Sequence, residues 1–124
     1  MSFEADVLPI FSASCTFSSC HGSPNGPGNN GIYLGARGGG NHDAAKIRAA
    51  LVEGSSPKLP SMKYVKPFDA ASSYLLVKID GSFCAVPECA DGRCGDRMPR
   101  GGSALDPAAI ETITLWIAQG APAK

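Results

Sequence analysis

The chain has 124 residues and a formal net charge of zero, with 11 Lys and Arg residues against 11 Asp and Glu residues. This length predicts a single domain over residues 1–124 and is too short for an enzyme with separate substrate and cofactor domains. The balanced charge argues against a nucleic-acid binder, and a hydrophobic content of 44% argues against a disordered tail. Because 15 Gly and 10 Pro predict long loops, we expect a disulfide, a metal or a cofactor to help hold the fold.

The first predicted helix lies within residues 3–20, where apolar side chains recur at helical spacing. Pro9 predicts that the regular helix begins near residues 6–7 or bends there, since proline disrupts the interior of a helix. Residues 22–42 are rich in Gly, Pro and Asn, which predicts a loop around one short apolar stretch at residues 32–34. The N-terminal third of the chain is therefore expected to be one helix followed by a long loop.

Two short helices are predicted in the middle of the chain. Residues 43–52 carry apolar side chains at helical spacing, and Gly54 ends this helix. The Pro-rich residues 55–69 are expected to be extended. A second helix opens at Ser72 or Ser73, continues through Ile79, and ends at Gly81.

The clearest predicted helix is the last one, which follows a stretch without regular pattern at residues 82–103. Asp106 suits the N-cap position and Pro107 suits the first helical position. Apolar residues then recur at intervals of three and four until Gly120 and Pro122 end the helix. The chain as a whole is predicted to be mostly helical with long loops.

The motif that carries chemistry is Cys15-x4-Cys20-His21. Two thiols followed at once by a histidine is the layout that attaches a c-type haem: the thiols form thioethers to the two vinyl groups, and the histidine ligates the iron. The usual spacer has about two residues, so the four residues present here must loop outward while both sulfurs reach the vinyl groups. The motif predicts one covalent haem c, held by Cys15, Cys20 and His21.

Two interpretations without haem stay open. Cys15 and Cys20 could form a plain disulfide, with His21 at the surface. The remaining cysteines recur at a spacing of five, and thiolates with one histidine can close a tetrahedral zinc site. These cysteines are Cys84, Cys89 and Cys94.

Met98 is the best candidate for the second axial ligand of a haem iron. It lies in a polar, Gly-rich loop beside Pro99, which is a poor position for a core methionine. A soft thioether sulfur suits low-spin iron and raises its reduction potential. Met62 is the rival sulfur ligand and His42 is the rival nitrogen ligand.

Taken together, these segments resemble small bacterial mono-haem class I c-type cytochromes, in particular a branch with a widened haem-binding spacer. The resemblance extends along the whole chain, through residues 7–11, 15–21, 31–34, 65–78, 94–99 and 113–121. It implies an all-α, cytochrome c-like fold in which the N- and C-terminal helices cross at a contact of small residues and pack around one haem. It further implies that Cys15 and Cys20 are the thioether residues, His21 the proximal ligand and Met98 the distal ligand.

The pairing of the other cysteines depends on how the haem is attached. With both Cys15 and Cys20 attached, three cysteines remain, which leaves one disulfide among Cys84, Cys89 and Cys94 and one free thiol. With only Cys20 attached, Cys15 becomes a disulfide residue and two disulfides are possible. A disulfide that closes onto Cys94 would brace the loop that carries Met98.

A haem with both axial positions filled has no place for a substrate, so we expect an electron carrier and not an enzyme. Apolar side chains around the haem, expected to include Phe11, Ile32, Leu34 and Trp116, would raise its potential. The expected partners are redox proteins of unknown identity, met through a small transient interface, and the chain is expected to be a monomer. Two alternatives are a haem domain of an enzyme with an open distal side, and a haem-free disulfide or zinc binding module.

No stretch reaches the roughly 18 apolar residues of a membrane span. The start of the chain lacks the layout of a secretory signal. Five cysteines nevertheless favour an oxidising compartment. We therefore expect a periplasmic or otherwise exported protein whose signal has been removed.

Overall fold

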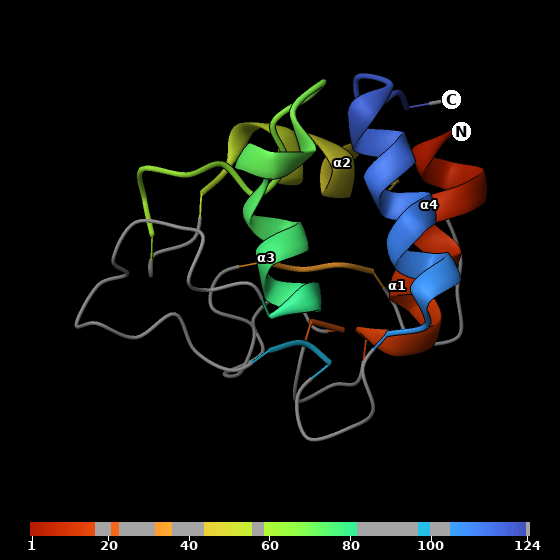
Figure 1. The fold of residues 1–124 in the computed structure, drawn as a ribbon. Coiled ribbons are helices and arrows are strands. Elements are labelled where there is room, and N and C mark those ends of the chain that lie inside the picture. The colour runs from red at the N-terminus through yellow and green to blue at the C-terminus, as the bar shows by residue number, and fades with distance from the viewer. Residues whose placement is uncertain are drawn as a thin grey trace.

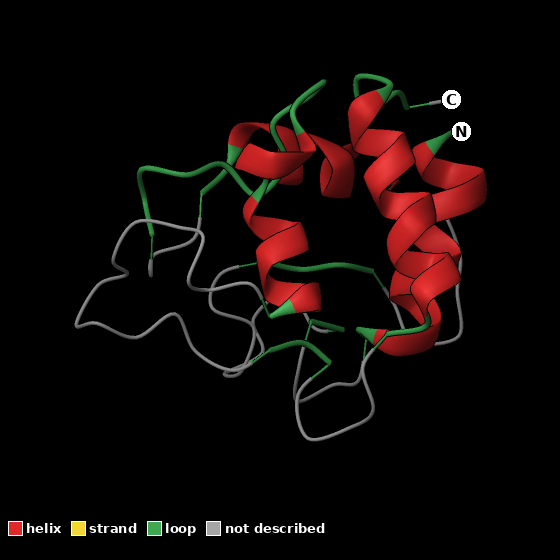
Figure 2. Ribbon diagram, in the orientation of Figure 1, coloured by secondary structure: helices red, strands yellow, loops and turns green. Residues whose placement is uncertain are grey.

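The computed structural model describes residues 1–16, 21–22, 32–35, 44–55, 59–81, 97–99 and 105–123. Its helices are η1 (Phe3–Val7), α1 (Leu8–Ser14), α2 (Ala44–Glu53), η2 (Ala70–Ser72), α3 (Tyr74–Asp80) and α4 (Pro107–Ala118). Within these residues the regular elements are all helices (Figure 2), and an isolated antiparallel bridge joins Ser55 and Lys63. The fold of the described part is all-α, as the sequence predicts.

The N-terminal helix changes its hydrogen-bonding pattern just before Pro9. Its first part, η1, is a π-helix, in which the amide of Leu8 donates to the carbonyl of Phe3, five residues back. The α-helix α1 then begins at Leu8 and carries Pro9 in its first turn, where a missing amide hydrogen is tolerated. The regular α-helix thus begins one residue after the predicted region at residues 6–7. The π-helical segment before it was not predicted.

The C-terminal helix α4 has the boundaries that its capping residues predict. A carboxylate oxygen of Asp106 accepts a hydrogen bond from the amide of Ala108 at 3.0 Å, and Pro107 is the first helical residue. Beyond the helix, Gly120 has a φ of 99°, which favours glycine. Helix α4 is thus defined at both ends by local sequence.

Helix α3 begins and ends where predicted, but Ser73 does not cap it with its side chain. The hydroxyl of Ser73 instead accepts from the amide of Lys66 at 2.8 Å and donates to the carbonyl of Asp69 at 2.9 Å. It therefore ties the turn before α3 together. At the other end, Gly81 has a φ of 78° and donates its amide to the carbonyl of Val77.

The N- and C-terminal helices lie side by side and share the main hydrophobic core (Figure 1). The ring of Phe3 lies 5.4 Å from that of the fully buried Trp116 and 6.0 Å from that of Phe11. Large aromatic side chains thus take part in this contact, whereas the family resemblance implies small residues. The carbonyl of Pro122 accepts from the amide of Phe3 at 3.1 Å and from Nε1 of Trp116 at 2.9 Å.

None of the helices in the described ranges is long and apolar enough to cross a membrane.

Candidate functional site

The first half of the haem motif lies at the end of α1. The amide of Cys15 donates to the carbonyl of Phe11 at 2.8 Å, which closes the last turn of the helix. The amide of His21 then donates to the carbonyl of Cys15 at 3.2 Å, so the chain returns to the helix end after five intervening residues. The structure therefore brings Cys15 and His21 together across the widened spacer. Cys20 lies outside the described residues.

The imidazole of His21 is held in one orientation by the backbone of residues 32–34. Its Nδ1 lies 2.8 Å from the carbonyl oxygen of Ile32, and the amide of Leu34 donates to the carbonyl of His21 at 2.9 Å. A carbonyl oxygen can only accept, so Nδ1 carries the hydrogen of this bond. In the neutral ring, the lone pair is then on Nε2, which is the atom left to bind a metal.

The surroundings of His21 favour the neutral imidazole. The ring is half-buried, and this burial lowers the pKa of His21 below its ordinary value. The hydrogen bond to Ile32 acts in the opposite direction, and the positive charge of Lys78 lowers the pKa further. A histidine that is neutral at pH 7 is ready to ligate a metal, because the metal binds the deprotonated nitrogen.

Met98 is anchored to the C-terminal end of α3. Its amide donates to the carbonyl of Lys78 at 2.8 Å, and its half-buried side chain packs against the main core. The side chain of the preceding residue, Arg97, packs against Gly81. A Cβ atom at position 81 would lie 3.0 Å from Cδ of Arg97. The segment of Met98 is thus held by α3, the helix whose Lys78 also lowers the pKa of His21.

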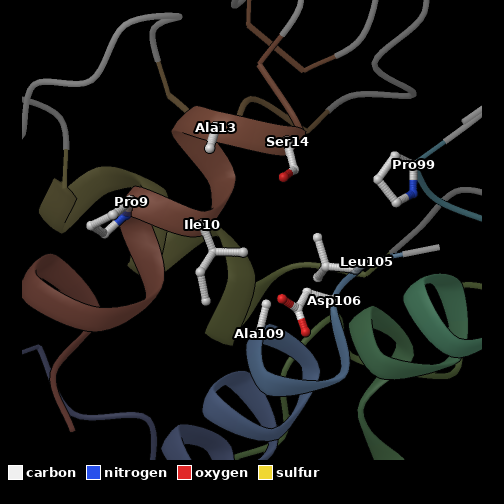
Figure 3. A pocket seen from close by; sticks show the side chains of 8 residues that line it. All are labelled: Pro9, Ile10, Ala13, Ser14, Pro99, Leu105, Asp106 and Ala109. Carbon is white, nitrogen blue, oxygen red and sulfur yellow. The ribbon is translucent and has the colours of Figure 1, made fainter. Parts of the chain in front are cut away.

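A pocket of about 400 Å³ lies between α1, the start of α4 and Pro99, and the residues that line it do not include Cys15, His21 or Met98. Figure 3 shows Ser14, the neighbour of Cys15, and Pro99, the neighbour of Met98, on two of its walls. The lining, which comes from α1, the start of α4 and the segment after Met98, is Pro9, Ile10, Ala13, Ser14, Pro99, Leu105, Asp106 and Ala109. Most of these side chains are apolar, as is usual in pockets that bind cofactors.

The rival ligands are less well placed or lie outside the description. Met62 packs against the second hydrophobic cluster, which consists of Leu59, Tyr74 and Val77, whereas Met98 packs against the main core, as Cys15 does. His42 and the cysteines of the zinc and disulfide predictions, Cys84, Cys89 and Cys94, lie outside the described residues. Within the residues that are described, no group of three or more His, Cys, Asp and Glu side chains could hold a metal ion.

The comparisons with known proteins give a distant likeness in fold. No known protein-family profile and no curated protein matches the sequence. Among solved structures, the fold is similar to part of the hydrazine synthase of Kuenenia stuttgartiensis, with a TM-score of 0.50 and 23% sequence identity. The match covers 98% of this chain and 16% of that chain, so this chain spans about a sixth of its neighbour. At this identity, the likeness concerns the fold alone.

The residues expected to surround a haem are buried together in the main core. Phe11, Ile32, Leu34 and Trp116 are each at most 8% exposed. Sequence reasoning missed two partners of the predicted ligands: the carbonyl of Ile32 on His21 and the carbonyl of Lys78 on Met98. Both are backbone atoms, which every residue type supplies, so no side-chain pattern could have indicated them.

Proposed function

We propose that the chain is an electron-transfer protein of the cytochrome c type that carries one covalent haem c, with His21 and Met98 as axial ligands. The observation that carries the proposal is the hydrogen bond between Nδ1 of His21 and the carbonyl of Ile32 at 2.8 Å. A metal-ligating histidine almost always donates its other ring N–H to a carbonyl, a carboxylate or water, which fixes the ring and its tautomer. Here that bond is found on the histidine that ends the C-x4-C-H motif.

The donor set fits a haem iron. The imidazole Nε2 of His21 and the thioether sulfur of Met98 are a nitrogen and a soft sulfur, the pair found in cytochromes that only transfer electrons. When bound, the haem supplies a one-electron redox couple. Cys15 and Cys20 are proposed to attach it.

The wider setting of this function is part of the proposal. The partners are redox proteins that meet the chain in a transient encounter, and the chain acts as a monomer in the periplasm or another exported compartment. An alternative is a haem domain of an enzyme, with an open distal side. The likeness in fold to part of the hydrazine synthase chain supports keeping this alternative in the tests.

Intact-mass spectrometry of the denatured protein tests the attachment. The protein is produced in a host equipped for cytochrome maturation, and a mass increase of one haem that survives denaturation is expected. Alkylation of the denatured protein counts the remaining thiols, and the variants Cys15→Ser and Cys20→Ser show whether one or both sulfurs hold the haem. A colourless parent protein without added mass contradicts the proposal.

The ferric absorption spectrum tests the distal ligand. A His/Met iron is low-spin and shows a weak sulfur-to-iron band at the red end of the spectrum. We expect Met98→Leu to abolish this band and to give high-spin iron, while the matched control Met62→Leu retains it. A parent protein with haem but no such band supports the open-distal alternative over the electron carrier.

A further inference from the structure

We propose that Gly81 is a positioning residue for Met98, and that it acts by ending α3 at the point where the backbone of Met98 is bound. This inference rests on the proposed function and deepens it, because it concerns how the distal ligand is held at the iron. Gly81 acts on the iron only through Met98.

Gly81 ends α3 with a left-handed turn. Its φ is 78° and its ψ is 18°, and its amide donates to the carbonyl of Val77 at 2.9 Å. Glycine adopts this conformation freely, whereas a residue with a side chain adopts it at a cost. The last four carbonyl groups of a helix have no amide partner within it. The carbonyl of Lys78 is one of these four, so the turn at Gly81 leaves it available to another segment.

The segment of Met98 binds to this end of α3 in two ways. The amide of Met98 donates to the carbonyl of Lys78 at 2.8 Å. The side chain of Arg97 lies against Gly81, where a Cβ atom would be 3.0 Å from Cδ and 3.5 Å from Cγ of Arg97. One backbone hydrogen bond and one side-chain contact therefore hold residues 97–98 at the turn that Gly81 makes.

The position of its backbone matters for Met98 because a methionine side chain is unbranched and flexible. Its sulfur can leave an iron unless the backbone is held close by. The half-buried side chain of Met98 packs against the main core, and the hydrogen bond to Lys78 holds its backbone. A strained turn at position 81 should weaken this hydrogen bond and with it the bond between sulfur and iron.

Displacement of Met98 by added imidazole tests this inference on the haem-loaded ferric protein. Imidazole competes for the iron, and loss of the sulfur-to-iron band measures the displacement. We expect Gly81→Ala to lower the imidazole concentration at half displacement by about fivefold, the factor that corresponds to the loss of one hydrogen bond. Gly81→Asn should stay close to the parent protein, because asparagine tolerates the left-handed conformation better than alanine does.

Gly120→Ala is the matched control. It also places an alanine at a glycine with a positive φ, here 99°, in the turn after α4. Urea unfolding should show that it is less stable than the parent protein, while its half-displacement concentration stays unchanged. If Gly81 had a merely structural role, displacement would follow stability, and Gly120→Ala would lose the band as easily as Gly81→Ala.

The inference is overturned if Gly81→Ala keeps the half-displacement concentration of the parent protein, or if Gly81→Asn falls as far as Gly81→Ala. If Gly81→Ala yields too little folded protein, all four proteins are titrated in sucrose, which favours the folded state, and the same criteria apply. A parent protein without haem, or without the sulfur-to-iron band, overturns the proposed function itself, which is a different outcome.

Discussion

Phe68 and Gly120 form a close contact in which an exposed aromatic ring lies on a glycine. Phe68 has a φ of 68° and is 76% exposed, yet its amide donates to the carbonyl of Ile117 at 2.8 Å. Gly120 has a φ of 99°, and a Cβ atom there would lie 2.5 Å from Cζ of Phe68. The backbone conformation therefore favours glycine at position 120, and a Cβ atom there would also force the ring of Phe68 to move.

We expect Gly120→Ala to lower the free energy of unfolding by about 1–3 kcal/mol from backbone strain, with a further loss from the clash. Gly81→Ala is the matched comparison, because its φ is 78° but the nearest atom is the flexible Cδ of Arg97 at 3.0 Å. Urea unfolding measures both. The loss of unfolding free energy should be larger for Gly120→Ala than for Gly81→Ala. Adding Phe68→Ala to Gly120→Ala should relieve the clash and recover part of that loss. Equal costs at the two glycines would show that the ring contact does not matter.

Asp69 gives the fold a pH dependence with a defined sign. Hydrogen bonds from Ser72 and the ion pair with Lys66, at 3.4 Å, lower the pKa of Asp69 below its ordinary value of 3.8. A carboxyl group whose pKa is lower in the folded state stabilises the fold above its unfolded-state pKa. That contribution is lost as the pH falls through the folded-state pKa.

The parent protein should therefore be more stable than Asp69→Asn at pH 7, and this difference should shrink as the pH is lowered below 3.8. Urea midpoints of the two proteins, measured over this range, test the prediction. A difference that is independent of pH would mean that the charge of Asp69 contributes nothing.

At the scale of single elements, the helices whose signals are local are the ones that the sequence predicts well. Helix α4 has a capping carboxylate, a proline at its first position and a regular apolar spacing, and all three recur in the structure. The π-helical pattern of η1 was not predicted, because it depends on how the segment before Pro9 packs against α4 and α2. In the candidate site, the motif pointed to Cys15 and His21, whereas the backbone partners of the ligands required the folded chain.

The N-cap of α4 offers a direct test of this local control. We expect Asp106→Ala to lower the free energy of unfolding by about 1 kcal/mol, because the amide of Ala108 loses its acceptor. Asp106→Asn keeps an oxygen at the same place and should cost much less. Urea unfolding of both variants is the measurement, and equal losses would show that the cap bond is not what stabilises the helix.

At the scale of the whole molecule, the carbonyl of Pro122 joins the two ends of the chain. It accepts hydrogen bonds from the amide of Phe3 and from Nε1 of Trp116, and both of these side chains are buried. The neighbouring carbonyl of Ala121 accepts from Nε of Arg48 on α2 at 2.6 Å. The last few residues thus satisfy donors from three separate elements.

Deleting residues 121–124 should therefore destabilise the protein strongly, since each buried donor left without an acceptor costs about 1–3 kcal/mol. Deleting only residue 124 keeps both carbonyl groups and is the control. Thermal unfolding followed by circular dichroism compares the two truncations. Similar melting temperatures would show that water replaces these acceptors without cost.

The proximity of the two termini also determines how this fold could be combined with other chains. The amino group of Met1 donates to Oε1 of Gln119 at 2.9 Å, and both termini are at the top right of Figure 1, while residues 21–22 and 97–99 are in its lower part. A host polypeptide could thus accept the whole unit as an insertion, because its points of entry and exit nearly coincide. The same geometry would allow a circular permutant with only a short linker, and in either case the attachment would be remote from residues 97–99.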